Sequence, residues 1–103
     1  MSDDPKVYLL KIVNDDKSLY KIGFTKESVY KRIRELQTGC PYQINVVDIY
    51  SSEYGMIIER SLHNMFSHNR TYGEWFELGV EDEVKFKKLC EQYENIQKLI
   101  NKK

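Results

Sequence analysis

The amino-acid sequence predicts an α+β fold, in which a small three-stranded sheet, mixed or antiparallel, is flanked by helices and followed by a long C-terminal helix. Two stretches rich in β-branched and aromatic residues flank a polar turn, and apolar residues recur at helical spacing in three later segments. The 103 residues, 41% of them hydrophobic, suit one core. We therefore expect a single domain over residues 1–103, with a motif-bearing core at 6–78 and the long helix at about 81–102.

The first two strands should form a β-hairpin. Residues 6–13 and 19–25 have strand composition, and residues 14–17 between them are typical of a turn. Gly23 lies near the end of the second strand, where the missing side chain permits a bulge or the close approach of another group.

A short helix and a third strand follow the hairpin. Apolar residues at i, i+4 and i+7 mark the buried face of the helix: Val29, Ile33 and Leu36. Thr25 or Ser28 is suited to cap it, and residues 38–41, which include Gly and Pro, should end it. Residues 44–50 have the pattern of a buried strand.

A central helix is expected over residues 54–66, with Ser51 or Ser52 as its cap. Its apolar stripe consists of Tyr54, Ile58, Leu62, Met65 and Phe66. Glu59 and His63 lie one turn apart along the edge of this stripe. The pair offers a metal ligand beside a proton carrier, although a Glu and a His at this spacing also form ordinary solvated pairs.

The last part of the chain should contain a short edge strand or anchor at residues 74–78, whose aromatic residues Trp75 and Phe76 close the core. The C-terminal helix then places apolar residues near heptad spacing: Phe86, Leu89, Tyr93, Ile96 and Ile100. We expect this stripe to pack on the sheet. Pairing with a second copy stays open, so the chain is expected to be a monomer or a weak homodimer.

Composition limits the function classes. The net charge is zero, which argues against a strongly nucleic-acid-binding protein, yet residues 17–34 carry six bases and one acid. A local basic patch fits transient phosphate contact.

No apolar run is long enough for a membrane span, and the acidic start resembles no secretory signal, so we expect a cytoplasmic protein. Cys40 and Cys90 belong to no Cys-x-x-Cys pair, and free thiols are expected.

Several short motifs stand in a definite order along the chain. They are Lys6-Val7-Tyr8, Tyr20-Lys21-Ile22-Gly23, an arginine on the next helix, Glu59 with His63, and Arg70 followed by Glu74-Trp75-Phe76. In this order and spacing they resemble the GIY-YIG nuclease superfamily. More narrowly, they resemble its branch in bacteriophages and large DNA viruses, which has Tyr-Lys-Ile-Gly and Glu-x-x-x-His elements and an Arg before Glu-Trp-Phe. The resemblance covers residues 6–78.

The resemblance implies metal-dependent hydrolysis of DNA phosphodiester bonds in a shallow groove. By position, Tyr8 matches the tyrosine of the first motif, Arg32 the helical arginine, and Glu59 the carboxylate that holds the divalent ion, Mg²⁺ or Mn²⁺. A lone carboxylate with waters is a usual way to bind Mg²⁺ when substrate phosphate completes the shell. The fork-shaped guanidinium of Arg32 is suited to stabilise charge that develops on a phosphate.

The second motif departs from the superfamily, because Lys21 stands where a tyrosine is usual and Tyr20 directly precedes it. Neighbours on a strand face opposite sides, so we assign Lys21 to the groove and Tyr20 to the core. The general base is then open: either His63, or Tyr8 assisted by the Lys21 ammonium, activates the attacking water. A tyrosine or lysine needs its pKa of about 10 lowered by about three units to act near pH 7, whereas a histidine needs almost no shift.

The sequence thus predicts a DNA endonuclease dependent on Mg²⁺ or Mn²⁺, active within an infected host cell if the viral resemblance holds. The alternative is a catalytically weak or inactive nuclease-like module that binds DNA or a protein partner. The residues expected to contact nucleic acid are Lys26, Lys31, Arg34 and Arg70. Because the chain has little room for a separate reader of sequence, we expect low selectivity or targeting by a protein partner. Duplex, branched and single-stranded DNA, and RNA, all stay open as substrates.

Overall fold

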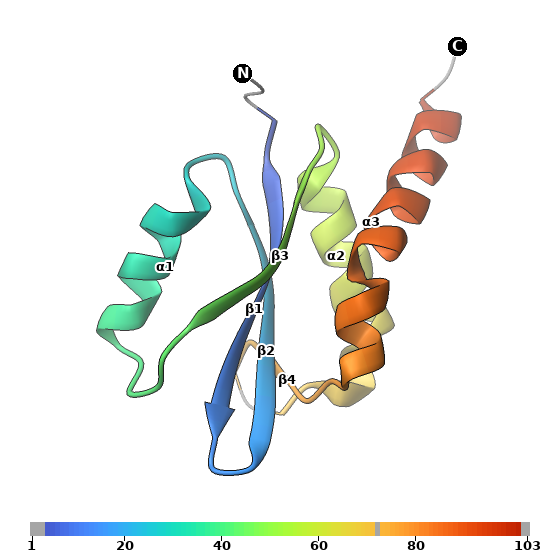
Figure 1. Ribbon diagram of the computed structural model, residues 1–103. Coiled ribbons are helices and arrows are strands. Elements are labelled where there is room, and N and C mark those ends of the chain that lie inside the picture. Colours follow the sequence, from blue (N-terminus) through green and yellow to red (C-terminus); the bar gives the residue numbers. More distant parts are fainter. Residues whose placement is uncertain (1–3, 72, 102–103) are drawn as a thin grey trace.

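Neighbouring strands of the sheet all run antiparallel, in the order β3-β1-β2-β4. The computed structural model describes residues 4–71 and 73–101. Along them the chain forms β1 (Lys6–Asn14), β2 (Lys17–Thr25), α1 (Val29–Thr38), β3 (Asn45–Ser51), α2 (Gly55–Met65), the 3-10 turn η1 (Ser67–Asn69), β4 (Trp75–Phe76) and α3 (Val80–Ile100). Figure 1 shows α1 on one side of the sheet and α2 with α3 on the other.

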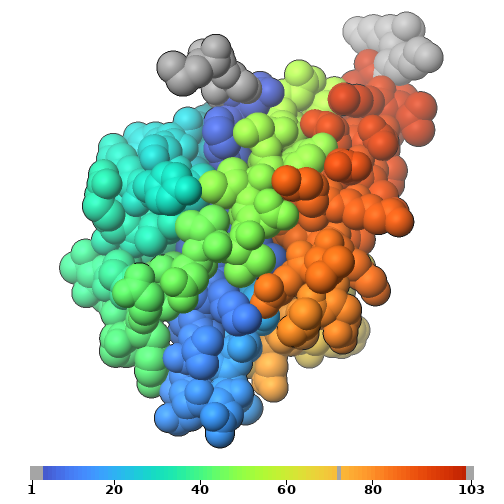
Figure 2. Space-filling model, viewed as in Figure 1, coloured from blue at the N-terminus to red at the C-terminus, as the bar shows by residue number. Residues whose placement is uncertain are grey.

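The predicted hairpin is confirmed. β1 and β2 pair along their whole length, and Asn14 faces Lys17, so the loop between them contains two residues. Asp15 has a φ of 57°, a left-handed conformation that Asp tolerates better than most side chains. In the space-filling view of Figure 2, β3 in green crosses the front between α1 and α3, and the hairpin tip forms the lower end.

Side chains that alternate along β1 and β2 build a core on each face of the sheet. On the α2 and α3 side, the buried cluster consists of Val7, Leu9, Tyr20, Ile22, Ile58, Leu62, Phe66, Phe76, Phe86 and Cys90. On the α1 side, it consists of Tyr8, Leu10, Ile12, Leu19, Val29 and Ile44. Tyr8 and Tyr20 are therefore both buried, but on opposite faces.

The expectation of three strands is wrong by one, because the short segment Trp75–Phe76 pairs with β2 as a fourth strand. Its Phe76 is fully buried, as expected, while Trp75 is only partly buried. The sequence left open whether the sheet is mixed or antiparallel, and all three strand pairs are antiparallel. A two-residue strand has no periodicity of its own, so its pairing depends on the partner strand and not on a local pattern.

Both predicted helix caps differ in detail. α1 begins after Ser28, but the Ser28 side chain makes no capping hydrogen bond, and the Thr25 Oγ1 instead accepts one from the Glu27 N–H at 3.1 Å. At α2 the residue in the cap position is Tyr54, so the predicted caps Ser51 and Ser52 are wrong. The Ser52 Oγ lies just upstream and accepts a hydrogen bond from the Tyr54 N–H at 3.0 Å.

α3 begins at Val80, where the Gly79 N–H donates to the Asp82 carboxylate at 2.8 Å. The helix ends at Ile100, and the expected end at residue 102 lies outside the described residues. Phe86 is buried, whereas Ile96 and Ile100 are exposed, so only the first part of the stripe packs on the sheet. Across the described residues no helix, α3 included, is both long enough and apolar enough to cross a membrane.

The two cysteines are free, as expected. Cys90 is fully buried in α3, and burial raises the pKa of its thiol to about 12. A thiol with so high a pKa stays protonated at neutral pH, which makes Cys90 a core residue and not a nucleophile.

Phe86→Ala should lower the free energy of unfolding by about 3–5 kcal/mol, because it removes a buried ring that joins α3 to the sheet. The measurement is urea unfolding followed by circular dichroism. Leu99→Ala, at an exposed position of the same helix, is the control and should change stability by less than about 0.5 kcal/mol. Equal effects of the two substitutions would contradict this packing.

Candidate functional site

The candidate site lies at the edge of β2, beyond the point where β4 stops. β4 pairs only with Tyr20 and Lys21, and past them the edge of β2 is covered by α2 instead. The His63 Nε2 lies 2.6 Å from the Ile22 carbonyl oxygen. A carbonyl only accepts hydrogen bonds, so Nε2 carries the proton and His63 satisfies an acceptor at this edge. Glu59 lies one helical turn earlier on α2.

Tyr8 stands at the centre of the site because Gly23 lies beneath its ring. The two residues are direct cross-strand partners, and a Cβ at Gly23 would lie 2.6 Å from the Tyr8 Cζ. No real Cβ contact is so short, so only glycine permits this position of the ring. The close approach expected at Gly23 is thus present, and the group that approaches is Tyr8.

The Tyr8 phenol is the point where several elements converge. Burial raises its pKa, a hydrogen bond from Arg32 and the Arg32 charge lower it, and the negative charges of Glu74 and Glu59 raise it slightly. These residues come from β1, α1, α2 and the segment before β4. The net direction is upward, so the phenol is protonated at neutral pH in the free protein.

Arg32 lies on the border between core and solvent, as its place on the helix predicts. Its side chain is 44% exposed and pairs with Glu35, three residues later, at 3.3 Å. An exposed pair of this kind contributes little to stability. The guanidinium therefore has donors that an incoming anion can engage, and it lies close enough to the Tyr8 phenol to lower the pKa of that phenol.

Lys21 and Tyr20 point to opposite faces of the sheet. Tyr20 lies in the core against α3, where its hydroxyl bonds the Glu83 carboxylate. Lys21 is only 5% exposed, pairs with the Glu74 carboxylate, and has its Nζ 6.0 Å from the centre of the Trp75 ring. The ammonium thus lies on the α1 face, beside the group of residues around Tyr8.

Both ring nitrogens of His63 are engaged. Nε2–H donates to Ile22, and Nδ1 lies 3.3 Å from the Arg70 Nη2. Because the guanidinium only donates, Nδ1 is the acceptor and the ring is a neutral, fixed tautomer. The Arg70 guanidinium also lies 5.3 Å from the centre of the Phe76 ring. This arrangement orients Arg70 along the edge of the site.

The other basic residues expected to contact nucleic acid are exposed. Lys26 lies in the loop before α1, and Lys31 and Arg34 lie on α1 itself. Lys31 pairs with Glu27 at 3.1 Å, with both side chains more than half exposed. These residues lie on both sides of Arg32 in the sequence, and all three are exposed.

Glu59 is suited to hold a hard cation. Its carboxylate is half-buried, and in the described part of the chain it forms no ion pair that would compete with a metal. Among these residues no three His, Cys, Asp or Glu side chains gather as a metal cage. A single oxygen ligand that leaves room for waters and phosphate oxygens fits Mg²⁺ or Mn²⁺ better than Zn²⁺.

Sequence reasoning missed the part played by Glu74 and Glu35. Glu74 was noted only as part of a motif, although its carboxylate neutralises the buried Lys21. The sequence holds no signal for this pair, because Glu74 reaches Lys21 only through the pairing of β4 with β2. Glu35 stands three residues after Arg32, a spacing that predicts a helical ion pair.

Gly23→Ala should displace the Tyr8 ring and lower the free energy of unfolding by about 1–3 kcal/mol, as overpacking of a filled site does. Chemical denaturation gives the free energy, and the aromatic NMR signals of Tyr8 report the displacement. The matched control is Gly39→Ala, where an added Cβ meets no atom within 4 Å. An unchanged Tyr8 environment in Gly23→Ala would contradict this packing.

The Lys21–Glu74 pair should stabilise the fold in a pH-dependent way. The hydrogen bond and charge of Lys21 hold the pKa of the Glu74 carboxyl below its ordinary value of 4.5. A lowered pKa in the folded state stabilises above the ordinary value, and this stabilisation is lost as the pH falls through the lowered one. The stability difference between the native chain and Glu74→Gln should therefore be full at neutral pH and shrink in acid.

The control for this pair is Glu77→Gln, because Glu77 pairs with Lys17 at 3.7 Å between two well-exposed side chains. That substitution should change stability little at any pH. Unfolding curves recorded from neutral to acidic pH provide the measurement. A Glu74→Gln effect that stays constant or grows in acid would contradict the assigned pair.

The family model of the T5orf172 domain matches residues 6–101. The match begins with β1 and extends past the end of α3, so all the strands, helices and site residues described above lie within it. No curated protein and no solved structure matches the chain. The T5orf172 domain is phage-associated and of the GIY-YIG/HNH-like nuclease type. The chain therefore belongs to the T5orf172 domain family, and is a nuclease-like or DNA-binding module.

Proposed function

We propose that this chain is a single domain and a metal-dependent endonuclease that hydrolyses DNA phosphodiester bonds. The observation that carries the proposal is the position of the Tyr8 ring over Gly23, beside the Ile22 carbonyl that His63 of α2 binds, with the charges of Arg32 and Glu59 acting on its phenol. Phosphodiester hydrolysis needs a proton acceptor, a cation for the phosphate and a ligand for a metal ion. Tyr8, Arg32 and Glu59 supply one of each.

Arg32 binds the scissile phosphate in this proposal. Its exposed pair with Glu35 can exchange for a phosphate at small cost, and its guanidinium is near enough to the Tyr8 phenol to act on the same phosphate. Two parallel N–H groups match two phosphate oxygens, and the interaction strengthens as negative charge develops in the transition state.

Glu59 is the proposed ligand of a divalent cation, Mg²⁺ or Mn²⁺. When bound, the ion would supply positive charge that polarises a phosphate oxygen and acidifies water. Glu59 is held by a helix whose Ile58 and Leu62 are fully buried, so its carboxylate is positioned by the core. Neutralising Glu59 also removes one of the negative charges that raise the pKa of Tyr8.

Of the two candidates for the general base, we favour Tyr8. Both nitrogens of His63 already hold hydrogen bonds, which suits a role in positioning the β2 edge and Arg70. Arg32 stabilises a phenolate at Tyr8, but burial keeps the pKa of this phenol above its ordinary value in the free protein, so Tyr8 acts as a base mainly at alkaline pH. Lys21 is bound to Glu74, so its ammonium acts on the site mainly by neutralising that carboxylate.

The surrounding basic residues are proposed to hold the DNA backbone. Lys26, Lys31 and Arg34 extend the phosphate-binding surface along α1, and Arg70 extends it along the β2 edge. A chain with zero net charge is expected to bind DNA weakly and with strong salt dependence. Targeting by a protein partner fits so weak an interaction.

A second candidate function is supported by the Lys21–Glu74 pair. Where the superfamily has a second tyrosine, this chain has a buried lysine already neutralised by a carboxylate. Such a pair adds no reactive group, so the same frame could hold DNA without turnover. Binding without metal-dependent cleavage would favour this second function.

Glu59→Gln should abolish metal-dependent nicking of supercoiled plasmid, because the amide keeps the shape of the side chain but loses the charge that binds the cation. We expect a rate loss of about 100-fold or more, in line with removal of an essential catalytic group. Glu91→Gln, at an exposed position of α3, is the matched control and should retain activity. Equal activity in the two variants would contradict the assignment of Glu59.

The pH dependence of cleavage should distinguish Tyr8 from His63 as base. The Tyr8 pKa lies above its ordinary value of 10, so the rate should rise steadily with pH through the neutral and mildly alkaline range. An imidazole with the ordinary pKa of about 6.5 would instead give a plateau above about pH 7.5. Tyr8→Phe should remove the pH-dependent rise, and a native profile in that variant would exclude Tyr8.

A further inference from the structure

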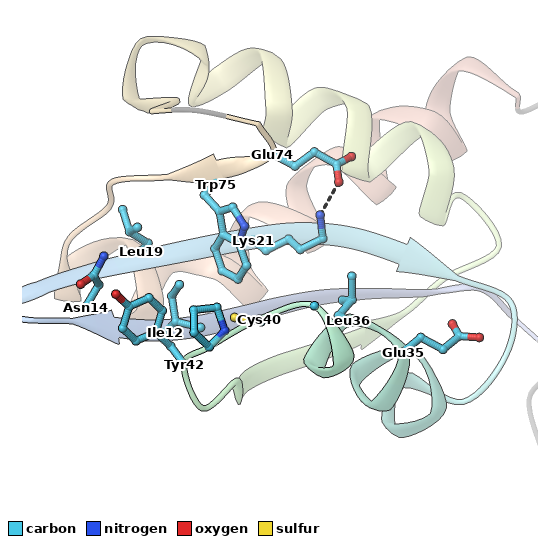
Figure 3. A pocket seen from close by; sticks show the side chains of 12 residues that line it. Ile12, Asn14, Leu19, Lys21, Glu35, Leu36, Cys40, Tyr42, Glu74 and Trp75 are labelled. Atoms are coloured by element: carbon cyan, nitrogen blue, oxygen red, sulfur yellow. Dashed lines mark hydrogen bonds and ion pairs between the residues drawn. The ribbon is translucent and has the colours of Figure 1, made fainter.

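A pocket of about 510 Å³ lies on the α1 face of the sheet, and its lining includes Lys21, Glu35 and Glu74, which pair with or act on residues of the proposed active site. Apolar and aromatic side chains from several elements line it: Ile12, Leu19, Leu36, Tyr42 and Trp75. Figure 3 shows Trp75 entering from β4 and Tyr42 from the segment after α1, over the same stretch of the hairpin. Pockets of this volume typically enclose small organic groups.

The walls of the pocket are fixed by hydrogen bonds. The Gln37 side-chain amide donates to the carbonyls of Tyr42 at 2.7 Å and Cys40 at 3.2 Å, and its oxygen accepts from the Ile44 N–H at 2.9 Å. This ties the segment that carries Tyr42 to α1. Trp75 is held by strand pairing with Lys21. The pocket is therefore formed before any ligand enters.

The charges in the lining favour a neutral ring over a phosphate. Lys21 is the basic residue among the lining residues, and its ammonium is already paired with Glu74, while the Glu35 carboxylate is paired with Arg32. A phosphate in the pocket would therefore meet two carboxylates and a lysine that is already neutralised. A nucleobase has aromatic faces that stack on Tyr42 and Trp75, and polar edges that the Asn14 amide and the carboxylates can bond.

An ion pair links the pocket to the site around Tyr8. Glu35 lines the pocket and pairs with Arg32 at 3.3 Å, and the Arg32 guanidinium lies close enough to the Tyr8 phenol to lower its pKa. Building on the proposed function, we propose that the pocket receives an unpaired nucleobase next to the phosphate held by Arg32. The substrate class is then DNA with unpaired bases, such as single strands, flaps or bulges, and not fully paired duplex. A base within a duplex is stacked and paired, so it would first have to leave the helix.

The single tryptophan of the chain, Trp75, reports directly on this pocket. The test titrates the full chain, without metal, with a single-stranded oligonucleotide and with an abasic oligonucleotide of the same length. Fluorescence anisotropy of labelled DNA gives affinity, and tryptophan emission gives stacking. We expect the base-bearing strand to quench the tryptophan emission to saturation. We also expect the abasic strand to bind at least about fivefold more weakly than the base-bearing strand. Equal affinities, or saturated binding without a change in emission, would overturn the proposal.

Variants make the test specific. Tyr42→Ala should remove the preference for the base-bearing strand, while Tyr42→Phe, which keeps the ring, should retain it. Tyr30→Ala is the matched control, because Tyr30 is 62% exposed on α1 and does not line the pocket. Gly39→Phe adds a ring at a lining position where an added Cβ meets no atom within 4 Å, so it should obstruct the pocket and also remove the preference. Retention of the preference in both Tyr42→Ala and Gly39→Phe would refute the pocket.

The binding test does not depend on turnover, so the two proposals fail separately. A chain that stacks bases in the pocket but cleaves no DNA would support the pocket and contradict the endonuclease. A chain that cleaves base-bearing and abasic strands at equal rates, with equal affinities for both, would support the endonuclease and contradict the pocket.

Discussion

The absence of a side chain at Gly23 is the constraint on which the site depends. Because the Tyr8 ring lies over this residue, its hydroxyl lies over β2, close enough to Arg32 of α1 for the guanidinium to lower its pKa. β4 ends before that edge, and α2 covers it with His63 against Ile22. A longer β4 or a side chain at position 23 would close the space in which Tyr8, Arg32 and Glu59 converge.

Charge pairing within the chain shows how a protein of zero net charge could carry the proposed phosphate-binding surface. Lys31 pairs with Glu27, and Arg32 with Glu35, in exposed contacts that water and salt weaken. Phosphate oxygens can replace these carboxylates. Lys21 differs, because it is buried and its carboxylate partner belongs to the segment before β4. Exchangeable pairs therefore lie on α1, and the fixed pair lies on the sheet.

Local pattern predicted most of the fold, since hairpin composition and helical periodicity are properties of short segments. The fourth strand, the cap at Tyr54 and the ion pair of Lys21 with Glu74 depend on contacts between distant segments, which no local pattern contains. The same limit applies to the site. Strand alternation correctly separated Lys21 from Tyr20, but the two hydrogen bonds that engage His63 come from Ile22 and Arg70, and they became visible only in the folded chain.

The central claim is that Tyr8, Arg32 and Glu59 surround one cation and one phosphate. Line broadening of backbone amide NMR signals by Mn²⁺ tests it most directly, because the paramagnetic ion marks the residues nearest to it whether or not catalysis occurs. The account predicts broadening centred on α2 around Glu59 and on the facing parts of β1 and β2 near Tyr8 and Gly23, with loss of this pattern in Glu59→Gln. Broadening centred on Asp15 and Asp16, or unchanged in Glu59→Gln, would contradict it.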